Sequence, residues 1–265
     1  MLPAGISLCK SVLITGATSG IGRALAFSIA DLPSKPQVIA VGRRQSRLDE
    51  LAERGLEPVN LDLGKDRDAL KKDLNSVVEK YPELDTIVLC AGIQHEFDFM
   101  NAESINIDDL YQEIHINYTS VVLSVIYLLP HLQKLSARGR NCSIIIVTSG
   151  LSIVPASWIP NYSATKAALH SFCMSLRAQL EGTKINVVEV IPALVESELH
   201  DAYGTTENLS KFWMPLDDFI GQLMPHLVDG TTEISIGMAE TIFKKFEAGK
   251  MDIASKIAIK HKEGQ

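Results

Sequence analysis

Short apolar runs rich in β-branched residues alternate along this chain with longer segments in which apolar residues recur at helical spacing. Most of the short runs are continuously apolar, which is typical of strands buried on both faces of a parallel sheet. The predicted strands are Ser11–Thr15, Gln37–Val41, Pro58–Leu61, Thr86–Cys90, Ser143–Thr148, Lys184–Val190 and Glu233–Ile236. The predicted helices are Gly22–Asp31, Ser46–Arg54, Asp66–Lys80, Ile107–Leu135, Asn161–Leu180, Leu216–Val228 and Ala239–Ala248.

This alternation predicts an α/β fold. Right-handed crossovers between parallel strands build a doubly wound, mostly parallel sheet with helices on both faces. We therefore expect a seven-stranded sheet of the Rossmann type. No linker or internal repeat interrupts the pattern, so residues 1–265 are predicted to form a single domain.

Composition excludes several classes of function. The formal net charge is −7 and there is no basic stripe, which argues against nucleic-acid binding. The four cysteines are far apart and the seven histidines show no ligand spacing, so we expect reduced thiols and no metal site. The longest apolar run, Tyr118–Pro130, is too short to span a membrane, and Met1–Cys9 lacks the basic start of a signal peptide. We expect a soluble cytoplasmic protein.

A glycine-rich turn, Thr15–Gly22, separates the first predicted strand from the first predicted helix. Gly16 permits a tight turn, Gly20 lets the backbone approach a pyrophosphate, and Gly22 permits close packing of the helix on the strand. The free N–H groups at the start of a helix favour phosphate. Such turns often serve geometry alone, but strand and helix flank this one in the order that a nucleotide site requires, so we predict a dinucleotide site.

The end of the second predicted strand indicates which dinucleotide. In NAD-binding versions of this fold, a carboxylate about 20 residues beyond the glycines binds the ribose 2′-hydroxyl. Here that region holds Gly42, Arg43 and Arg44, with no carboxylate. Guanidinium groups bind a 2′-phosphate through charge-assisted, forked hydrogen bonds. Adjacent arginines can also simply solvate a loop, but their position favours NADP(H) over NAD(H).

Three residues form a candidate catalytic set. Tyr162 and Lys166 lie four residues apart, on one face of a predicted helix. A phenol, with a reference pKa of about 10, needs a nearby ammonium or the positive ring of an oxidised nicotinamide to exchange protons at neutral pH. Ser149 follows the strand Ser143–Thr148, at the edge where doubly wound folds bind ligands. A Tyr-x-x-x-Lys pair or a turn serine is common on surfaces, so only the combination indicates chemistry.

Together these motifs resemble those of the short-chain dehydrogenase/reductase family, over about Ser11 to Gly249. The residues that carry the resemblance are Thr15–Gly22, Ala91-Gly92, Asn117, Ser149 and Tyr162-x-x-x-Lys166. The chain is most similar to an oxidoreductase subgroup named for the lipoteichoic-acid D-alanylation operon, by Ala91–Gln94, Leu129–Leu132, Thr148–Leu151, Tyr162–Ser171 and Leu176-Arg177. The subgroup name establishes no substrate.

The resemblance implies a role for each motif. Tyr162 would transfer the proton, Lys166 would bind the nicotinamide ribose and lower the pKa of Tyr162, and Ser149 would orient the carbonyl. Asn117 would hold a water that links Lys166 to solvent. The cofactor contacts expected are Gly16, Thr18, Ser19, Gly20, Ile21, Gly22, Arg43, Arg44, Asp62, Leu63, Ala91, Gly92, Tyr162, Lys166, Pro192, Val195 and Ser197. Substrate contacts are expected from Trp158, Tyr203 and Trp213, with residues 199–215 as a lid.

The implied function is NADP(H)-dependent interconversion of a small or medium carbonyl compound and its alcohol. The family resemblance also implies a homodimer or homotetramer through the helices around 107–135 and 161–180. A non-catalytic NADP-binding sensor or scaffold, and an epimerase or dehydratase on the same fold, remain alternatives. Two departures from the family pattern, Cys90 in place of an amide and Ala193 in place of a glycine, leave the acid–base set intact.

Overall fold

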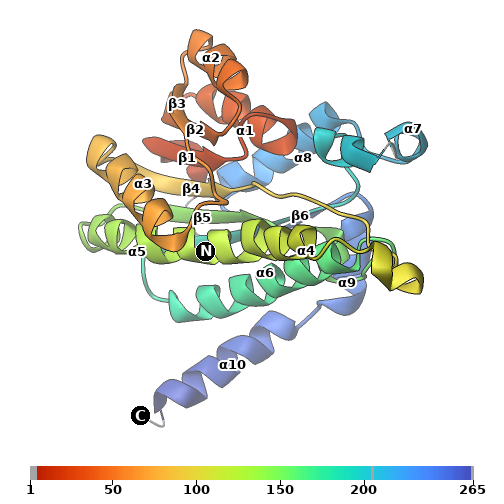
Figure 1. Cartoon of the computed structure of the whole chain (residues 1–265). Helices are drawn as coiled ribbons and strands as arrows, with labels where there is room; N and C mark the ends of the chain where they lie inside the picture. Colours follow the sequence, from red (N-terminus) through yellow and green to blue (C-terminus); the bar gives the residue numbers. More distant parts are fainter. Residues whose placement is uncertain (1–4, 204–205, 264–265) are drawn as a thin grey trace.

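In the computed structural model, which describes residues 5–203 and 206–263, the predicted strands form one parallel sheet of seven strands in the order β3-β2-β1-β4-β5-β6-β7. The strands are β1 (Ser11–Thr15), β2 (Gln37–Gly42), β3 (Glu57–Asn60), β4 (Leu84–Leu89), β5 (Cys142–Val147), β6 (Ile185–Pro192) and β7 (Glu233–Ile236). Each strand begins and ends within two residues of its predicted bounds. The predicted doubly wound fold is therefore confirmed (Figure 1).

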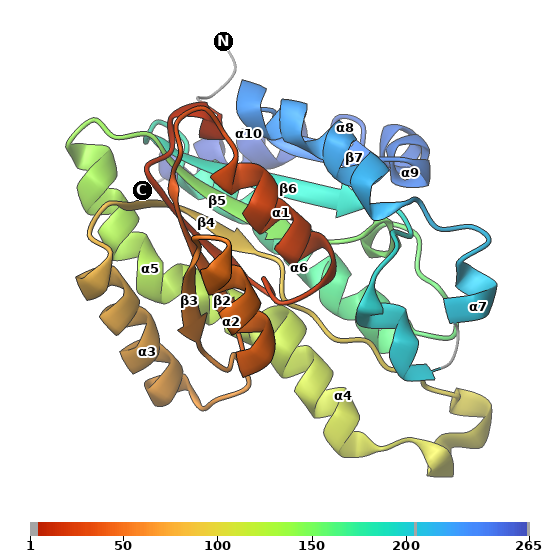
Figure 2. The same cartoon turned by 90° about the horizontal axis from the view of Figure 1, so that it is seen from above.

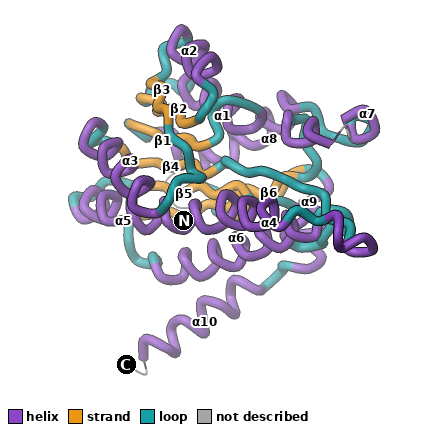
Figure 3. Tube along the Cα trace, viewed as in Figure 1, coloured by secondary structure: helices purple, strands orange, loops and turns teal. Residues whose placement is uncertain are grey.

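Helices cover both faces of this sheet (Figure 3). They are α1 (Gly20–Ala30), α2 (Gln45–Glu53), α3 (Arg67–Lys80), α4 (Ile107–Ile114), α5 (Ser120–Ala137), α6 (Pro160–Gln179), α7 (Thr206–Leu209), α8 (Leu216–Asp229), α9 (Met238–Phe246) and α10 (Lys250–Glu263). On one face α1 and α8 pack together, with Leu25 and Phe219 in their shared core. On the other face α3, α5 and α6 contribute Leu74, Leu128 and Leu169 to a second core.

The central strands explain the continuous apolar runs in the sequence. Every residue of β1, β4 and β5 is buried, because helices cover these strands on both sides. The direction of the strand order reverses between β1 and β4. The loops that leave their carboxyl ends therefore diverge and open a crevice, which is where such sheets bind ligands.

The segment predicted as one helix, Ile107–Leu135, is instead α4 and α5 joined by a π turn over His115–Thr119. A π turn carries one extra residue and often marks a functional position. By length and mean hydropathy alone, the continuous stretch Ile107–Ala137 could cross a membrane. Here Leu128 and Leu132 of α5 lie fully in the second core, so the apolar character of this stretch is explained by packing.

The segment predicted as a lid, residues 199–215, contains most of a 3-10 helix (Glu198–Tyr203) and then α7, after which the chain returns so that Met214 pairs with Val195. Its role as a lid stays a prediction. The last helix, α10, was not predicted. In Figure 1 it lies below α6 and extends away from the sheet, and its Ile253 and Ile257 are exposed. No single continuous apolar face marked it as a core helix.

Candidate active site

A cavity of about 670 Å³ lies at the carboxyl ends of the central strands and is lined in part by Glu198, Leu199 and Leu209. Figure 2 shows this end of the sheet, with α7 beside it. Its volume is in the range of small-molecule and cofactor sites. Of the predicted site residues, those that line it are Gly16, Ser19, Gly20, Ile21, Gly22, Arg44, Ala91, Gly92, Ser149, Trp158, Tyr162, Lys166, Pro192, Val195 and Ser197. Among the described residues, Thr18, Arg43, Asp62, Leu63, Asn117 and Trp213 lie outside its lining. The side chain of Tyr203 lies outside the part that the structure describes.

The turn between β1 and α1 holds glycines where larger residues do not fit. Gly16 has a φ of +71°, and a Cβ added to Gly22 would lie 2.4 Å from the Gly16 carbonyl oxygen. Gly20 packs closely against Ser197, because a Cβ at Gly20 would lie 3.2 Å from that of Ser197. The Ser19 side chain makes no capping hydrogen bond to α1, so N–H groups of the first turn are available. The turn has the geometry that a pyrophosphate needs.

Thr15 joins β1 to the end of β4, where the sequence departs from the family pattern. Its Oγ1 accepts hydrogen bonds from the N–H groups of Cys90 (3.0 Å) and Ala91 (3.3 Å). These bonds connect the two strands although Cys90 supplies no side-chain amide. Burial raises the pKa of the Cys90 thiol to about 11, so this thiol is neutral at physiological pH.

Tyr162 lies in the first turn of α6, which begins with Pro160. Only 7% of Tyr162 is exposed. Burial raises the pKa of its phenol well above the ordinary value, the charge of Glu113 adds to this, and a hydrogen bond with Ser149 opposes it. The sequence predicted that Lys166 lowers the pKa of Tyr162, but burial outweighs any such effect in the protein alone. The phenol is therefore neutral and hydrogen-bonded.

Lys166 is also buried, one turn further along α6. Burial lowers the pKa of its ammonium to about 8. The Lys166 Nζ donates a hydrogen bond to the carbonyl oxygen of Val147 at 2.9 Å and lies 5.6 Å from the centre of the Tyr162 ring. The lysine is thus fixed between β5 and the phenol, at the floor of the cavity.

Asn117 belongs to the π turn and is fully buried. Its Oδ1 accepts from the Ile93 N–H and its Nδ2 donates to the Ile93 carbonyl, both at 2.8 Å, while Nδ2 also donates to Thr165 Oγ1 at 3.2 Å. A Cβ at Gly92 would lie 3.3 Å from Asn117 Oδ1 and 3.6 Å from Lys166 Nζ. Asn117 therefore clamps the loop after β4 beside the lysine. Its predicted water contact remains a prediction.

Two arginines follow β2. The Arg44 Nε and Nη2 lie 3.4 and 3.2 Å from Thr18 Oγ1, which joins Arg44 to the glycine-rich turn. The Arg43 Nη1 lies 3.6 Å from Asp62 Oδ1, outside the cavity lining. A Cβ at Gly42 would lie 2.3 Å from the Thr18 methyl carbon. Because of this contact, a larger side chain at position 42, such as the acidic residue of NAD-binding versions of the fold, would require Thr18 to move.

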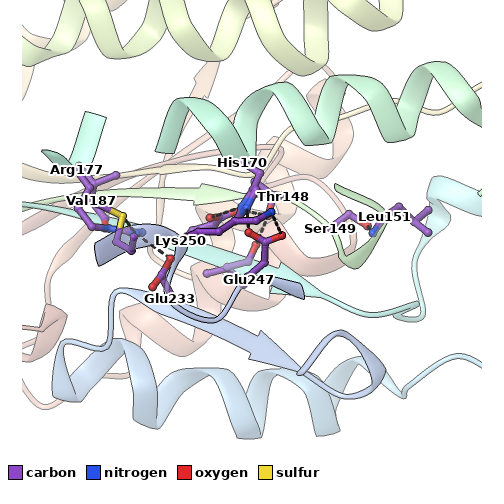
Figure 4. Close-up of polar contacts among 12 residues, drawn as sticks. Thr148, Ser149, Leu151, His170, Arg177, Val187, Glu233, Glu247 and Lys250 are labelled. Carbon is purple, nitrogen blue, oxygen red and sulfur yellow. Dashed lines mark hydrogen bonds and ion pairs between the residues drawn. The ribbon is translucent and has the colours of Figure 1, made fainter. Parts of the chain in front are cut away.

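A buried ionic cluster around His170 lies next to Thr148 and Ser149 (Figure 4). The sequence does not predict this cluster. His170 Nδ1 lies 2.9 Å from Glu189 Oε1, and its Nε2 lies 3.0 Å from Glu247 Oε2. Thr148, the neighbour of Ser149, donates its hydroxyl to Glu189 at 2.7 Å. Burial disfavours the charged imidazole, but the two carboxylates outweigh it and raise the pKa of His170 to about 9. Glu189 within the apolar run of β6 was the available signal.

The cavity wall beyond Tyr162 combines apolar side chains with one polar side. The apolar residues there are Leu151, Trp158, Ile159, Leu199, Leu209, Met238 and Ile242. On the polar side His95 Nδ1 lies 2.9 Å from Oε2 of Glu113, whose side chain is fully buried and whose pKa is raised by burial. Most of these residues are not predicted from the sequence, because they come from separate segments that only the fold brings together.

A parallel sheet with a glycine-rich first turn and a Ser–Tyr–Lys set at its carboxyl edge defines a dinucleotide-binding oxidoreductase class. The family described as short chain dehydrogenase matches residues 10–208. The chain belongs to this family.

Relatives agree with this assignment. An uncharacterized oxidoreductase of Bacillus subtilis, DltE, is 33% identical over 229 residues, which cover 85% of this chain and 87% of that protein. An NADP-dependent 3-hydroxy acid dehydrogenase of Schizosaccharomyces pombe is 31% identical over 71% of this chain and 73% of its own length.

Solved structures share the fold. A short-chain dehydrogenase from Sphingobium yanoikuyae in complex with NADPH has a TM-score of 0.76 at 22% identity, covering 92% of this chain and 95% of that one. A 3-ketoacyl-(acyl-carrier-protein) reductase from Brucella melitensis complexed with NADH has a TM-score of 0.75 at 24% identity, covering 86% and 96%. The chain is therefore an oxidoreductase of this family, and it shares its fold with these two structures.

Proposed function

We propose that the protein reduces a small or medium, partly apolar carbonyl compound to its alcohol with NADPH, and that Tyr162 is the acid–base residue. The observation that carries this proposal is the buried phenol of Tyr162, hydrogen-bonded to Ser149 at the junction of the glycine-lined and apolar parts of one cavity. A substrate carbonyl at this junction would meet both hydroxyl groups.

The residues present fit a nicotinamide dinucleotide. Gly16, Ser19, Gly20, Ile21 and Gly22 line the cavity, and the first turn of α1 has no side-chain cap, so its N–H groups would face a pyrophosphate there. Arg43 and Arg44 would bind the 2′-phosphate, which supports NADP(H) over NAD(H). Among the relatives, the fission-yeast dehydrogenase is named as NADP-dependent, whereas one solved structure of this fold holds NADH.

Each polar residue would act on the substrate oxygen or on the proton. Ser149 would donate a hydrogen bond to the carbonyl oxygen, and Tyr162 would transfer its proton to that oxygen. A neutral, buried phenol is suited to proton donation, which favours the direction of reduction. Lys166, with a pKa of about 8, would return a proton towards the phenol. When bound, the nicotinamide supplies the hydride.

Deuterium transfer tests this function. NADPH labelled with deuterium at C4 would be incubated with the protein and a panel of ketones and aldehydes, and the products analysed by mass spectrometry. The proposal expects the label in an alcohol product. Binding of NADPH without turnover of any compound would favour a sensor or scaffold, and turnover without net label transfer would favour epimerisation or dehydration.

We further propose that the protein is a cytoplasmic homodimer or homotetramer that associates through α4–α5 and α6. Ile107, Tyr111 and Ile126 expose apolar side chains on α4 and α5, and their burial would stabilise association. Light scattering after size exclusion should give a mass above one 29.0 kDa chain. A monomer at micromolar concentration would refute this arrangement.

A further inference from the structure

Glu198 is the first residue of the 3-10 helix that leads into the predicted lid, and it lies against two arginines from the other side of the cavity. Its Oε2 is 2.6 Å from Arg44 Nη1, and its Oε1 is 3.1 Å from Arg47 Nη2. One carboxylate therefore pairs with two guanidinium groups. These contacts connect the lid to the loop after β2 and to the first turn of α2, across the end of the cavity next to the glycine-rich turn.

One of these two arginines, Arg44, is a predicted ligand of a 2′-phosphate, together with Arg43. Arg44 and Glu198 both line the cavity, and the remaining donors of Arg44 face Thr18. Arg43 has the longer contact with Asp62, at 3.6 Å. The three arginines thus face two carboxylates, which leaves one positive charge at this end of the cavity. A phosphate would reach Arg44 only in competition with Glu198.

We propose that Glu198 is a cofactor-selectivity residue, which occupies the guanidinium groups that a 2′-phosphate would bind and so weakens the binding of NADP(H) but not of NAD(H). This inference rests on the proposed NADP(H) site. Carboxylate and phosphate oxygens accept hydrogen bonds from the same forked donors, and two anions on one guanidinium repel each other. The hydrogen bond from Arg44, with the charge of Arg47, lowers the pKa of Glu198, so the carboxylate is ionised at neutral pH.

The lid position of Glu198 adds a second consequence. A phosphate that displaces Glu198 also releases the contact that holds the start of the 3-10 helix to α2. The choice of cofactor is therefore coupled to how the lid is held. With NAD(H), which lacks the 2′-phosphate, the contacts of Glu198 with Arg44 and Arg47 persist.

The variant Glu198→Gln tests the proposal, because it keeps the shape and removes the charge. Glu196→Gln is the matched control: Glu196 lies two residues earlier in the same loop and accepts a hydrogen bond from the Leu216 N–H, and no arginine of the described residues forms an ion pair with it. Dissociation constants for NADPH and NADH would be measured by fluorescence titration. Those for adenosine 2′,5′-bisphosphate and adenosine 5′-monophosphate would be measured by calorimetry.

Glu198→Gln is expected to bind NADPH and the bisphosphate roughly three- to tenfold more tightly, with NADH and the monophosphate changed less than about twofold. Glu196→Gln should match the wild type. Equal changes for both cofactors, or weaker NADPH binding in Glu198→Gln, would overturn the inference and leave the proposed function intact. Wild-type protein that binds neither cofactor would overturn both.

Discussion

At the scale of single residues, the environment of Tyr162 decides how it can act. Burial favours the neutral phenol, and Ser149 is the residue that hydrogen-bonds it. Burial also lowers the pKa of the nearby Lys166 ammonium, and the pKa of Tyr162 stays above its ordinary value in the protein without cofactor. Alcohol oxidation needs the phenolate form of Tyr162 as a base. The positive ring of an oxidised nicotinamide is the remaining charge that would favour this form, so we expect the phenolate to form only when the oxidised cofactor is bound.

Removal of the Tyr162 hydroxyl tests its role directly. Tyr162→Phe should lower turnover by at least about 100-fold, the usual contribution of a positioned acid, because it removes the hydroxyl that is proposed to supply the proton. NADPH binding should change little, since the ring remains. Steady-state rates and a fluorescence titration would show both effects. Tyr127→Phe, on α5 and outside the cavity lining, is the control. A Tyr162→Phe enzyme with wild-type turnover would remove Tyr162 from this role.

The arginine after β2 gives a second residue-scale prediction. Arg43→Ala should weaken NADPH binding roughly 10-fold or more, the value of a hydrogen bond to a charged group, because the contact of Arg43 with Asp62 is long, at 3.6 Å, and a phosphate would compete with it readily. NADH binding should stay within about twofold. Arg67→Ala removes the same charge from an exposed site on α3 and should affect neither cofactor. An equal loss for NADPH and NADH would refute the assignment of Arg43.

At the scale of elements, the sequence predicts the sheet well because burial on both faces leaves a plain apolar signal. β1 and β7 have their predicted bounds. The glycine turn and the Tyr162–Lys166 spacing are also local, so the sequence could indicate them.

The parts that were missed depend on contacts between distant segments. The π turn is tied through Asn117 to a loop 24 residues earlier, and the pattern of α4 and α5 alone could not show it. The cluster around His170 takes its carboxylates from β6 and from the end of α9. Such groups become visible only when the fold is known.

This cluster makes a prediction about pH. The groups facing His170 are Glu189 from β6, Glu247 at the end of α9, and Lys250, which pairs with Glu247 from α10. The pKa of His170 rises from 6.5 to about 9 on folding. Its stabilising effect is thus fully present below pH 6.5 and is lost as the pH rises towards 9.

Urea unfolding between pH 6 and pH 9.5 would measure the effect. The contribution of His170 to the free energy of unfolding should fall by up to about 3 kcal/mol over this range. Loss of the charge on Lys166 above its pKa of about 8 acts in the opposite direction, so the His170 contribution is taken as the difference between the wild type and His170→Gln. His226→Gln, at an exposed position on α8, should keep the wild-type pH dependence. An unchanged pH dependence in His170→Gln would exclude His170 as its source.

At the scale of the whole molecule, one cavity crosses the carboxyl edge of the sheet and is lined by residues from both halves of the chain. A ligand in it would contact the β1–α1 turn, the ends of β4 and β5, α6 and the lid together. Cofactor binding should therefore raise the free energy of global unfolding, in addition to ordering any single loop.

Thermal unfolding would show this. At a concentration of about 100 times its dissociation constant, NADPH should add roughly 2.7 kcal/mol and raise the Tm by about 5–10 °C. NADH at the same concentration should raise it less, because it lacks the 2′-phosphate contacts. Scanning calorimetry with each cofactor is the measurement. A larger shift with NADH would contradict the proposed preference.

The π turn at His115–Thr119 also constrains how the chain can change length. Deleting one residue there would let α4 and α5 continue as a regular helix, and the later side chains of α5 would keep nearly the same phase, because five residues of a π turn advance about as far around the axis as four residues of an α-helix. Leu128 and Leu132 would then stay in the core, but Asn117 would lose the position from which it clamps Ile93. In insertion–deletion libraries, one-residue deletions in this stretch should therefore give folded protein with an altered active site.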